Sequence, residues 1–294
     1  MSEDRFSPPR RSKRLSIAIP ASIVDDIPHK RDKTLMVGLI GRAASIFRVD
    51  EIIVYRDMPN TDQKESSELI ADILSYMETP QYLRRRLIPM KPSLRYAGVL
   101  PPLRTPHHPV KRRFVDLFVG EYREGIVISS SEKRSLVDIG VSRPAHIPNV
   151  KLPIGKRVTV KIVGLGRRAL GKLVSKEDVE IYWGYTVRNR GEKLSDLLRR
   201  EADELIIATS RRGKDVHEEI DQLKERIKLS KKILLLFGAP TQGLYEIAKR
   251  ENLNLEESVD FVLNMIRNQG TATVRTEEAV VATLAIINMV WEKG

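Results

Sequence analysis

The first eighty residues alternate between short apolar runs and helical patterns. Short, mostly apolar runs over 15–20 and 51–55 predict two strands. Over 30–47 and 61–78 the apolar side chains recur every three or four residues, which predicts two helices. This alternation of strands and helices is typical of a sheet covered by helices.

The middle of the chain has a different pattern. Six prolines between positions 89 and 109 predict a stiff connection and not a continuing core. Four β-type runs separated by turn residues follow, and short strands at such spacing predict a small all-β barrel. The runs are 114–122, 125–129, 135–140 and 156–163. In the first of them Phe114, Phe118 and Tyr122 would share one face, either as core or as a stacking platform.

The α/β pattern returns after residue 180. Strands are predicted over 182–187, 204–210, 233–237 and 261–266, and helices over 193–200, 217–229 and up to Met289. Glycine-containing loops follow the strand ends near Thr209, Phe237 and Met265. Because such loops meet at one edge of an open α/β sheet, they should enclose a ligand there. They contain neither G-x-G-x-x-G nor G-x-x-x-x-G-K-[ST], so neither a dinucleotide nor a triphosphate site is predicted.

Positive charge is concentrated in the middle of the chain. Residues 81–180 contain 21 Lys and Arg against 8 Asp and Glu, whereas the rest of the chain is almost neutral. A concentrated positive region indicates a polyanionic partner such as RNA. A solvated surface, in a chain with 31% charged residues, is the alternative interpretation.

Several short motifs together resemble one family. They are Gly41-Arg42-Ala43-Ala44 with 49–55, then Phe237-Gly238 and Gly243, and finally Asn264, Gln269-Gly270 and 275–279. In this order and spacing they resemble the SPOUT class of RNA methyltransferases, in particular the archaeal and eukaryotic branch with an inserted OB-like domain. The resemblance covers nearly the whole chain after about residue 14. It implies an RNA substrate, a homodimer, and a C-terminal trefoil knot that binds S-adenosylmethionine.

The expected fold is therefore an α/β protein of SPOUT type. Its open parallel sheet ends in a trefoil knot and is interrupted by a small all-β barrel of OB or S1 type. We expect a flexible basic tail over 1–14 and a discontinuous methyltransferase domain over 15–104 and 180–294. The inserted RNA-binding domain should cover 105–179, although an insert with only a structural role is also compatible with the pattern.

The resemblance also implies roles for individual residues. Arg42 is the expected catalytic residue, since it matches an arginine motif that binds near the target nucleotide, but it could also be an ordinary surface arginine. At Arg275 and Thr276 helix capping competes with function, and Asn264 could simply form a turn. The expected cofactor-binding residues are Thr209, Arg212, Gly213, Phe237, Gly238, Gly243, Asn264, Gln269, Gly270, Thr273 and Arg275. The expected RNA-binding residues are Arg84, Arg85, Arg86, Arg112, Arg113, Arg167 and Arg168.

Composition narrows the chemistry. The chain has no cysteine, which excludes disulfides, cysteine-ligated zinc and a cysteine nucleophile. Methylation at carbon 5 of a pyrimidine normally needs an attacking thiolate, so the acceptor should be a nitrogen or an oxygen. His107-His108 is too isolated to predict a metal site. No apolar run approaches the roughly 20 residues of a membrane span, and the polar N-terminus is not a secretory signal, so we expect a cytoplasmic protein.

The sequence thus predicts an S-adenosylmethionine-dependent methyltransferase that acts on ribosomal or transfer RNA, at a base nitrogen or a ribose oxygen. A non-catalytic RNA-binding or ribosome-assembly protein on the same scaffold is the alternative. An oxidoreductase of Rossmann type is disfavoured by the missing glycine motif.

Overall fold

The computed structural model describes residues 6–291, which form two compact units. One unit, the barrel unit, comprises residues 6–10, 79–90 and 103–184; the sheet unit comprises 11–78, 91–102 and 185–291. The predicted inserted domain of 105–179 lacks residues 79–90, 103–104 and 180–184, which belong to the barrel unit. Tyr82 belongs to the barrel unit because its hydroxyl donates to the carbonyl oxygen of Glu124 (2.8 Å). Leu100 belongs to the sheet unit, where it packs against Gly38.

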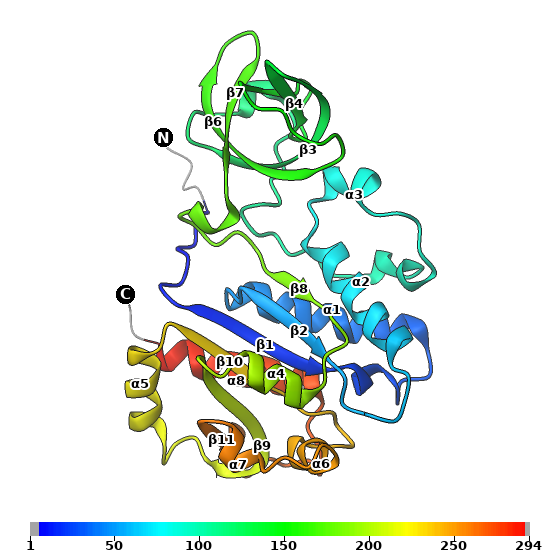
Figure 1. Ribbon diagram of the computed structural model, residues 1–294, viewed down its shortest axis with the longest axis vertical. Helices are drawn as coiled ribbons and strands as arrows, with labels where there is room; N and C mark the ends of the chain where they lie inside the picture. Colours follow the sequence, from blue (N-terminus) through cyan, green and yellow to red (C-terminus); the bar gives the residue numbers. More distant parts are fainter. Residues whose placement is uncertain (1–5, 292–294) are drawn as a thin grey trace. The chain divides into compact units, whose positions relative to one another are not determined.

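The sheet unit contains a parallel sheet of six strands within residues 14–264 (Figure 1). The order across the sheet is β11 (Phe261–Asn264), β9 (Leu205–Asp215), β10 (Lys232–Leu236), β1 (Arg14–Pro20), β2 (Glu51–Tyr55) and β8 (Thr186–Arg188). Parallel strands covered on both faces are almost wholly apolar, which is why the predicted bounds of β1, β2 and β10 are correct nearly to the residue. The open parallel sheet is confirmed, and the trefoil knot stays a prediction.

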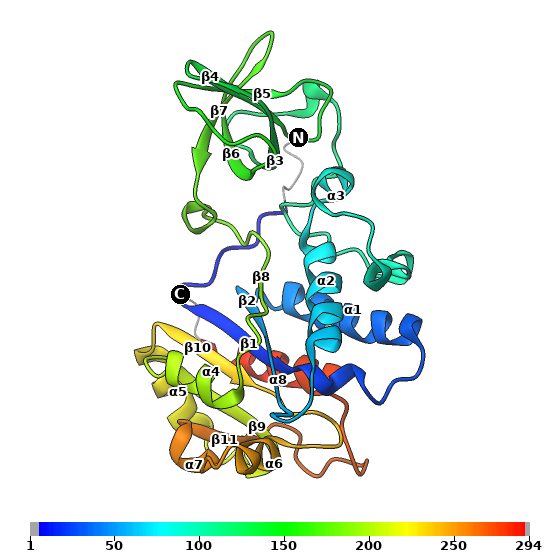
Figure 2. The same cartoon turned by 45° about the vertical axis from the view of Figure 1, so that its right-hand side comes forward.

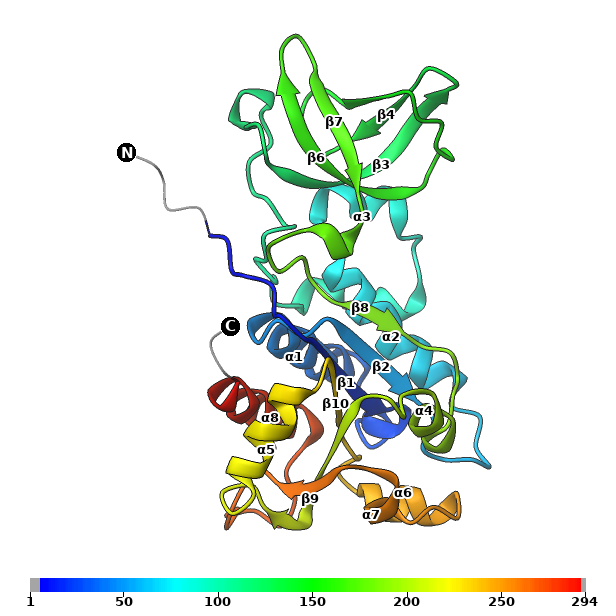
Figure 3. The same ribbon diagram turned by 60° about the vertical axis from the view of Figure 1, so that its left-hand side comes forward.

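Helices cover both faces of this sheet (Figure 3). On one face a buried cluster joins the strands to α4 (Leu194–Arg200), α6 (Leu244–Arg250) and α7 (Leu255–Ser258). On the other face α1 (Lys30–Ile46) packs beside α8 (Thr276–Val290) and α2 (Lys64–Glu78). Helix α5 (Ile220–Leu229) buries Leu223 and Ile227. No helix within 6–291 is both long and apolar enough to cross a membrane.

The barrel unit contains a closed barrel with the strand order β3-β4-β5-β7-β6 (Figure 2). The strands are β3 (Tyr122–Ser131), β4 (Arg134–Asp138), β5 (Ala145–Pro148), β6 (Arg157–Leu165) and β7 (Ala169–Val174). Only β5 and β7 pair in parallel. Val127, Val137 and Val160 lie in its core. The predicted all-β barrel is confirmed. The same unit contains helix α3 (Gln81–Leu87).

Two predictions in this region need correction, and two strands were not predicted. Residues 114–122 are not a strand: Phe114–Asp116 is a 3-10 turn, and Leu117 then enters the barrel core. The sequence pattern does not reveal β5 and β7, because β5 has only four residues and β7 alternates around a glycine. The strand predicted over 182–187 begins only at Thr186. Trp183, which precedes this strand, is nevertheless buried. Its indole N–H donates to Glu124 Oε1 (2.5 Å).

The N-terminal segment also differs from the predicted flexible tail. Residues 1–5 lie outside the described residues. From there on, basic side chains bind carbonyl groups: Arg10 donates to Glu177 O (2.5 Å), and Arg11 donates to Phe47 O (3.0 Å). The buried Arg11 also donates to Asn288 Oδ1 (2.9 Å). This segment is therefore held by specific hydrogen bonds.

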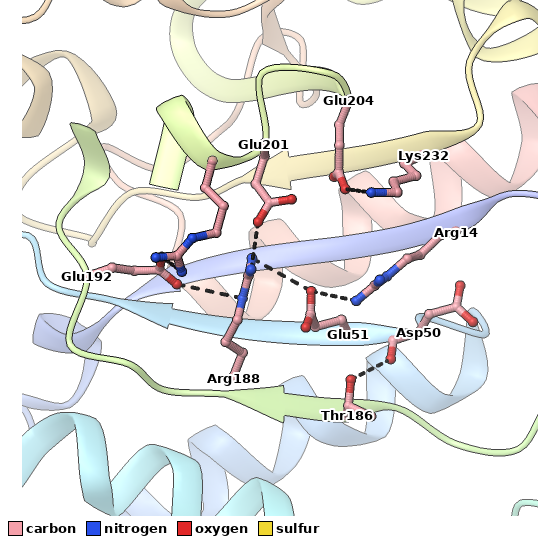
Figure 4. Close-up of polar contacts among 10 residues, drawn as sticks. Arg14, Asp50, Glu51, Thr186, Arg188, Glu192, Glu201, Glu204 and Lys232 are labelled. Carbon is pink, nitrogen blue, oxygen red and sulfur yellow. Dashed lines mark hydrogen bonds and ion pairs between the residues drawn. The ribbon is translucent and has the colours of Figure 1, made fainter. Parts of the chain in front are cut away.

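A network of ion pairs lies where several parallel strands begin (Figure 4). Arg188 approaches Glu51 (3.7 Å), Glu192 (3.6 Å) and Glu201 (2.6 Å). Beside it, Lys232 lies 3.5 Å from Glu204. Four glutamates thus face four cations: Glu51, Glu192, Glu201 and Glu204 against Arg14, Arg188, Arg200 and Lys232. Burial and the neighbouring Glu201 carboxyl group raise the pKa of Glu204 to about 7.

We expect Glu204→Gln to stabilise the protein at pH 8 and to have little effect at pH 5. The folded-state pKa lies above the ordinary 4.5, so folding favours the protonated form. The contribution of Glu204 to stability therefore falls as the pH rises from 4.5 to 7 and stays low above that. The gain in unfolding free energy at pH 8 should be about 1 kcal/mol, allowing for screening by solvent.

Urea unfolding at both pH values measures this, with the exposed Glu225→Gln as control. If both variants gain the same unfolding free energy at pH 8, the raised pKa of Glu204 does not affect stability. The same holds if Glu204→Gln gains more unfolding free energy at pH 5 than at pH 8.

Candidate cofactor site

A cleft opens at the carboxyl edge of the sheet, where β9, β10 and β11 end. Its volume is about 270 Å³. Loops after the three strands and the first turns of α8 form its wall. The lining residues are Thr209, Ser210, Arg211, Arg212, Phe237, Gly238, Ala239, Pro240, Thr241, Gly243, Glu246, Asn264, Met265, Ile266, Gln269, Ala272, Thr273, Val274, Thr276, Ala279 and Thr283.

Strand β9 leaves the sheet where it reaches the cleft. Ala208 still pairs with Val262, but the next pair joins Lys214 to Leu263, so residues 209–213 bulge out of the ladder. At the return point a Cβ on Gly213 would lie 2.5 Å from the carbonyl oxygen of Val262. Only glycine allows this close approach. The bulge places Thr209 and Arg212 in the lining of the cleft, whereas Gly213 is not part of the lining.

Hydroxyl groups hold the chain at the end of β10. Three consecutive carbonyl groups each accept a hydrogen bond from a side chain of a different element. Burial and the nearby Asp57 carboxylate raise the pKa of Tyr55, so this donor keeps its proton. Because their carbonyls are already bonded, these residues present a fixed backbone to the cleft. The pairs are Thr209 Oγ1 to Leu236 O (2.9 Å), Tyr55 Oη to Phe237 O (2.7 Å) and Thr276 Oγ1 to Gly238 O (3.0 Å).

The following loop folds back on itself. The amide of Ala239 donates to Gln242 O (3.0 Å), and the amide of Gln242 donates to Ala239 O (3.2 Å). A Cβ on Gly238 would lie 3.0 Å from both Gly243 Cα and the amide nitrogen of Leu244. A side chain at position 238 would therefore require the backbone of Gly243 and Leu244 to shift by a few tenths of an ångström.

A charged pair forms part of the rim. Arg212 Nη2 lies 2.6 Å from Glu246 Oε1, and the guanidinium stacks over the Tyr245 ring at 4.4 Å from its centre. Both charged side chains are about half exposed. A cation and an anion side by side match a zwitterionic amino-acid group, which is the charged end of S-adenosylmethionine.

Asn264 and Gln269 line the cleft, but their amides bind the backbone. Asn264 Oδ1 accepts from the amide of Ile266 (3.1 Å), and its Nδ2 donates to Arg211 O (3.3 Å). Gln269 Nε2 donates to Thr271 O (2.8 Å). Asn264 therefore makes the contacts of a turn-forming residue. Both side chains hold the backbone of loops that border the cleft.

Helix α8 begins at Thr276, and Arg275 occupies the N-cap position. The Arg275 amide donates to Glu278 Oε2 (2.9 Å), as in a capping box. Thr276 is therefore not the N-cap that the sequence suggests. Its hydroxyl instead binds a carbonyl at the cleft.

The cleft brings together most of the expected cofactor-binding residues. Three of them lie outside the lining: Gly213, Gly270 and Arg275. Sequence reasoning missed others, including Ala279 and Thr283, which follow Thr276 on one side of α8. One signal could have identified these lining residues. In an otherwise apolar helix, small and hydroxyl side chains recur at steps of three and four.

Arg42 does not line the cleft. It lies on α1, and its Nη1 donates to Pro102 O (3.0 Å). Helical spacing places it in one stripe with three exposed apolar side chains, Leu35, Leu39 and Ile46. Its expected catalytic role stays a prediction.

The expected RNA-binding arginines all lie in the barrel unit. Some are held by local partners: Arg84 Nε donates to Thr79 O (2.9 Å), and Arg86 lies 3.4 Å from Asp138. Arg113 forms two hydrogen bonds to Asp116, and Arg168 Nη1 lies 3.1 Å from His146 Nε2. Arg85, Arg112 and Arg167 are exposed.

Comparison with known proteins places the chain in a family. Residues 14–287 match the family described as "Putative RNA methyltransferase". The mouse 28S rRNA (uridine-N(3))-methyltransferase is 34% identical over 94% of this chain and 76% of its own length. The human protein of the same name is 33% identical over 97% and 79%. An uncharacterised protein of Halobacterium salinarum is 33% identical over 93% and 98%. The chain therefore belongs to this family of S-adenosylmethionine-dependent RNA methyltransferases of the SPOUT class.

Proposed function

We propose that this protein methylates N3 of a uridine in ribosomal RNA. The observation that carries the proposal is the similarity, over more than nine-tenths of the chain, to mouse and human proteins named for that reaction. The composition agrees with it, because a nitrogen acceptor needs no cysteine nucleophile and the chain has none.

The cleft at the carboxyl edge of the sheet is the proposed cofactor site. Its loops offer backbone groups held in place by Tyr55, Thr209 and Thr276, and its rim offers a cation and an anion. S-adenosylmethionine supplies an activated methyl group. N3 forms the new bond to the methyl carbon, the electron pair of the carbon–sulfur bond stays on sulfur, and the proton of N3 passes to water. The protein's task is to hold the uracil at attack distance and to favour its deprotonated form.

We also propose a homodimer formed through α1 and α8. These helices pack side by side and carry exposed apolar side chains, among them Leu39 on α1 and Met289 on α8. An exposed apolar surface of this kind is typical of a subunit interface. Arg42 lies in the α1 stripe, so the same dimer would place it at the interface. Light scattering of the purified chain tests this, and the mass of a monomer would contradict it.

The barrel unit is the proposed RNA platform. It holds most of the basic span 81–180, and its exposed arginines include neighbours in the β6–β7 hairpin, Arg167 and Arg168. We expect Arg167→Glu with Arg168→Glu to weaken RNA binding and to flatten its salt dependence. The slope here is that of the logarithm of the binding constant against the logarithm of the salt concentration. Removing one contact to a phosphate should lower its magnitude by about 0.7 to 0.9.

RNA binding measured across a salt series checks this. Glu132→Gln with Glu177→Gln, which also changes charge on the same unit, is the control and should leave the slope unchanged. If the double arginine variant keeps both affinity and slope, the barrel does not supply the RNA surface.

The proposed function is tested by mapping methylated nucleotides in ribosomal RNA from cells that lack this protein. A uridine should lose its N3 methyl group, and expression of the protein should restore it. An unchanged set of modifications would contradict the proposal.

A further inference from the structure

One enclosed hydroxyl group of the cleft, that of Thr283 on α8, has no hydrogen-bond partner among residues 6–291. Thr283 is only 1% exposed, yet it belongs to the lining. Buried polar groups in native proteins almost always have a partner, so an exception needs an explanation. A helical threonine commonly bonds to the carbonyl four residues earlier, here that of Ala279, but Thr283 makes no such bond.

The other threonines near it show how unusual this is. Thr209 and Thr276 also line the cleft, and both donate to carbonyl groups at the end of β10. Along α8, Thr276, Ala279 and Thr283 follow at steps of three and four and therefore share one side of the helix. The side chain between the two threonines is a single methyl group. Thr283 thus carries an unused donor and acceptor on a residue that lines the cleft.

We propose that the Thr283 hydroxyl hydrogen-bonds the adenosine portion of S-adenosylmethionine. The inference rests on the proposed cofactor site. A charged group is costly to enclose beside a neutral hydroxyl, so the amino-acid end of the cofactor belongs at the half-exposed pair Arg212 and Glu246. The adenosine portion is neutral and has polar atoms on its base edge and ribose. It therefore fits an enclosed hydroxyl.

Two substitutions separate the hydroxyl from the shape of the side chain. Thr283→Val keeps the volume and removes the hydroxyl, and Thr283→Ser keeps the hydroxyl. Calorimetry with S-adenosylhomocysteine and with 5′-methylthioadenosine, which lacks the amino-acid end, measures the effect. Thr283→Val should raise both dissociation constants by the same factor, about three- to tenfold, as expected for one neutral hydrogen bond. Thr283→Ser should stay within about twofold of the wild type.

The unliganded protein provides a second readout. Removing a buried hydroxyl that has no partner should leave the unfolding midpoint of Thr283→Val unchanged or raise it. A merely structural hydroxyl predicts the reverse pattern, a lower midpoint with unchanged affinities, and that result would overturn the inference.

The remaining outcomes are also decisive. If Thr283→Val weakens S-adenosylhomocysteine but not 5′-methylthioadenosine, the hydroxyl contacts the amino-acid end, and the assignment to adenosine is wrong. If the wild-type protein binds neither compound, the proposed cofactor site fails, and the inference fails with it. Wild-type binding with unchanged affinities in Thr283→Val refutes the inference alone.

Discussion

Gly238→Val should lose most of its affinity for S-adenosylhomocysteine while the protein stays folded. A Cβ at this position would lie 3.0 Å from Gly243 Cα and from the amide of Leu244, so this part of the loop must shift by a few tenths of an ångström to admit it. The obstruction is backbone and not a flexible side chain. Overpacking of this kind costs about 1 to 3 kcal/mol, which corresponds to about 5- to 150-fold in the dissociation constant when the loop shape is required for binding.

Gly270→Val is the matched control. A Cβ on Gly270 would meet nothing within 4 Å, and the residue is not part of the lining. Its affinity should stay within about twofold of the wild type. Calorimetry on both variants, with circular dichroism as a check of folding, gives the comparison. A folded Gly238→Val protein with wild-type affinity would show that the cofactor does not bind in this cleft.

Arg42→Ala should reduce turnover by about 100-fold and leave cofactor affinity nearly unchanged. Removing one donor that stabilises charge in the transition state typically costs this much. Arg42 lies outside the cleft of its own chain, which is why the cofactor should be bound normally. Single-turnover rates with saturating RNA, together with calorimetry, separate the two effects.

Arg31→Ala, an exposed arginine on the same helix paired with Asp32 at 3.8 Å, is the control and should retain wild-type turnover. Wild-type turnover of Arg42→Ala would refute the catalytic role. Mixed dimers of Arg42→Ala and Gly238→Val chains extend the test. They recover activity only if Arg42 serves the cleft of the partner subunit, and they stay inactive if each chain uses its own arginine.

The sheet could be predicted because its strands are buried on both faces. Residues 15–20 and 51–55 are mostly apolar and 233–237 is wholly apolar, and runs of this kind identify buried parallel strands. The barrel was harder, because its short strands alternate and contain glycine. The apolar run around Phe114 has the pattern of a strand, although its side chains reach the barrel core from a turn.

The site was predictable only where a loop follows a strand. Thr209, Phe237 and Asn264 lie at such ends and do line the cleft. Contacts between distant segments left no local signal. Tyr55 reaches the carbonyl of Phe237 across 182 positions, and Gly213 is required by the backbone of another strand. The unpaired hydroxyl of Thr283 is likewise visible only once the helix is packed.

Methyl transfer by the purified protein shows whether it is a uridine-N3 methyltransferase of ribosomal RNA. Ribosomal RNA from cells that lack the protein would be incubated with it and with labelled S-adenosylmethionine, then digested to nucleosides and analysed by mass spectrometry. We expect N3-methyluridine at one position, formed together with S-adenosylhomocysteine, and none with Gly238→Val. A label on a ribose oxygen or on carbon 5, or no label in RNA that a folded protein binds, would contradict it.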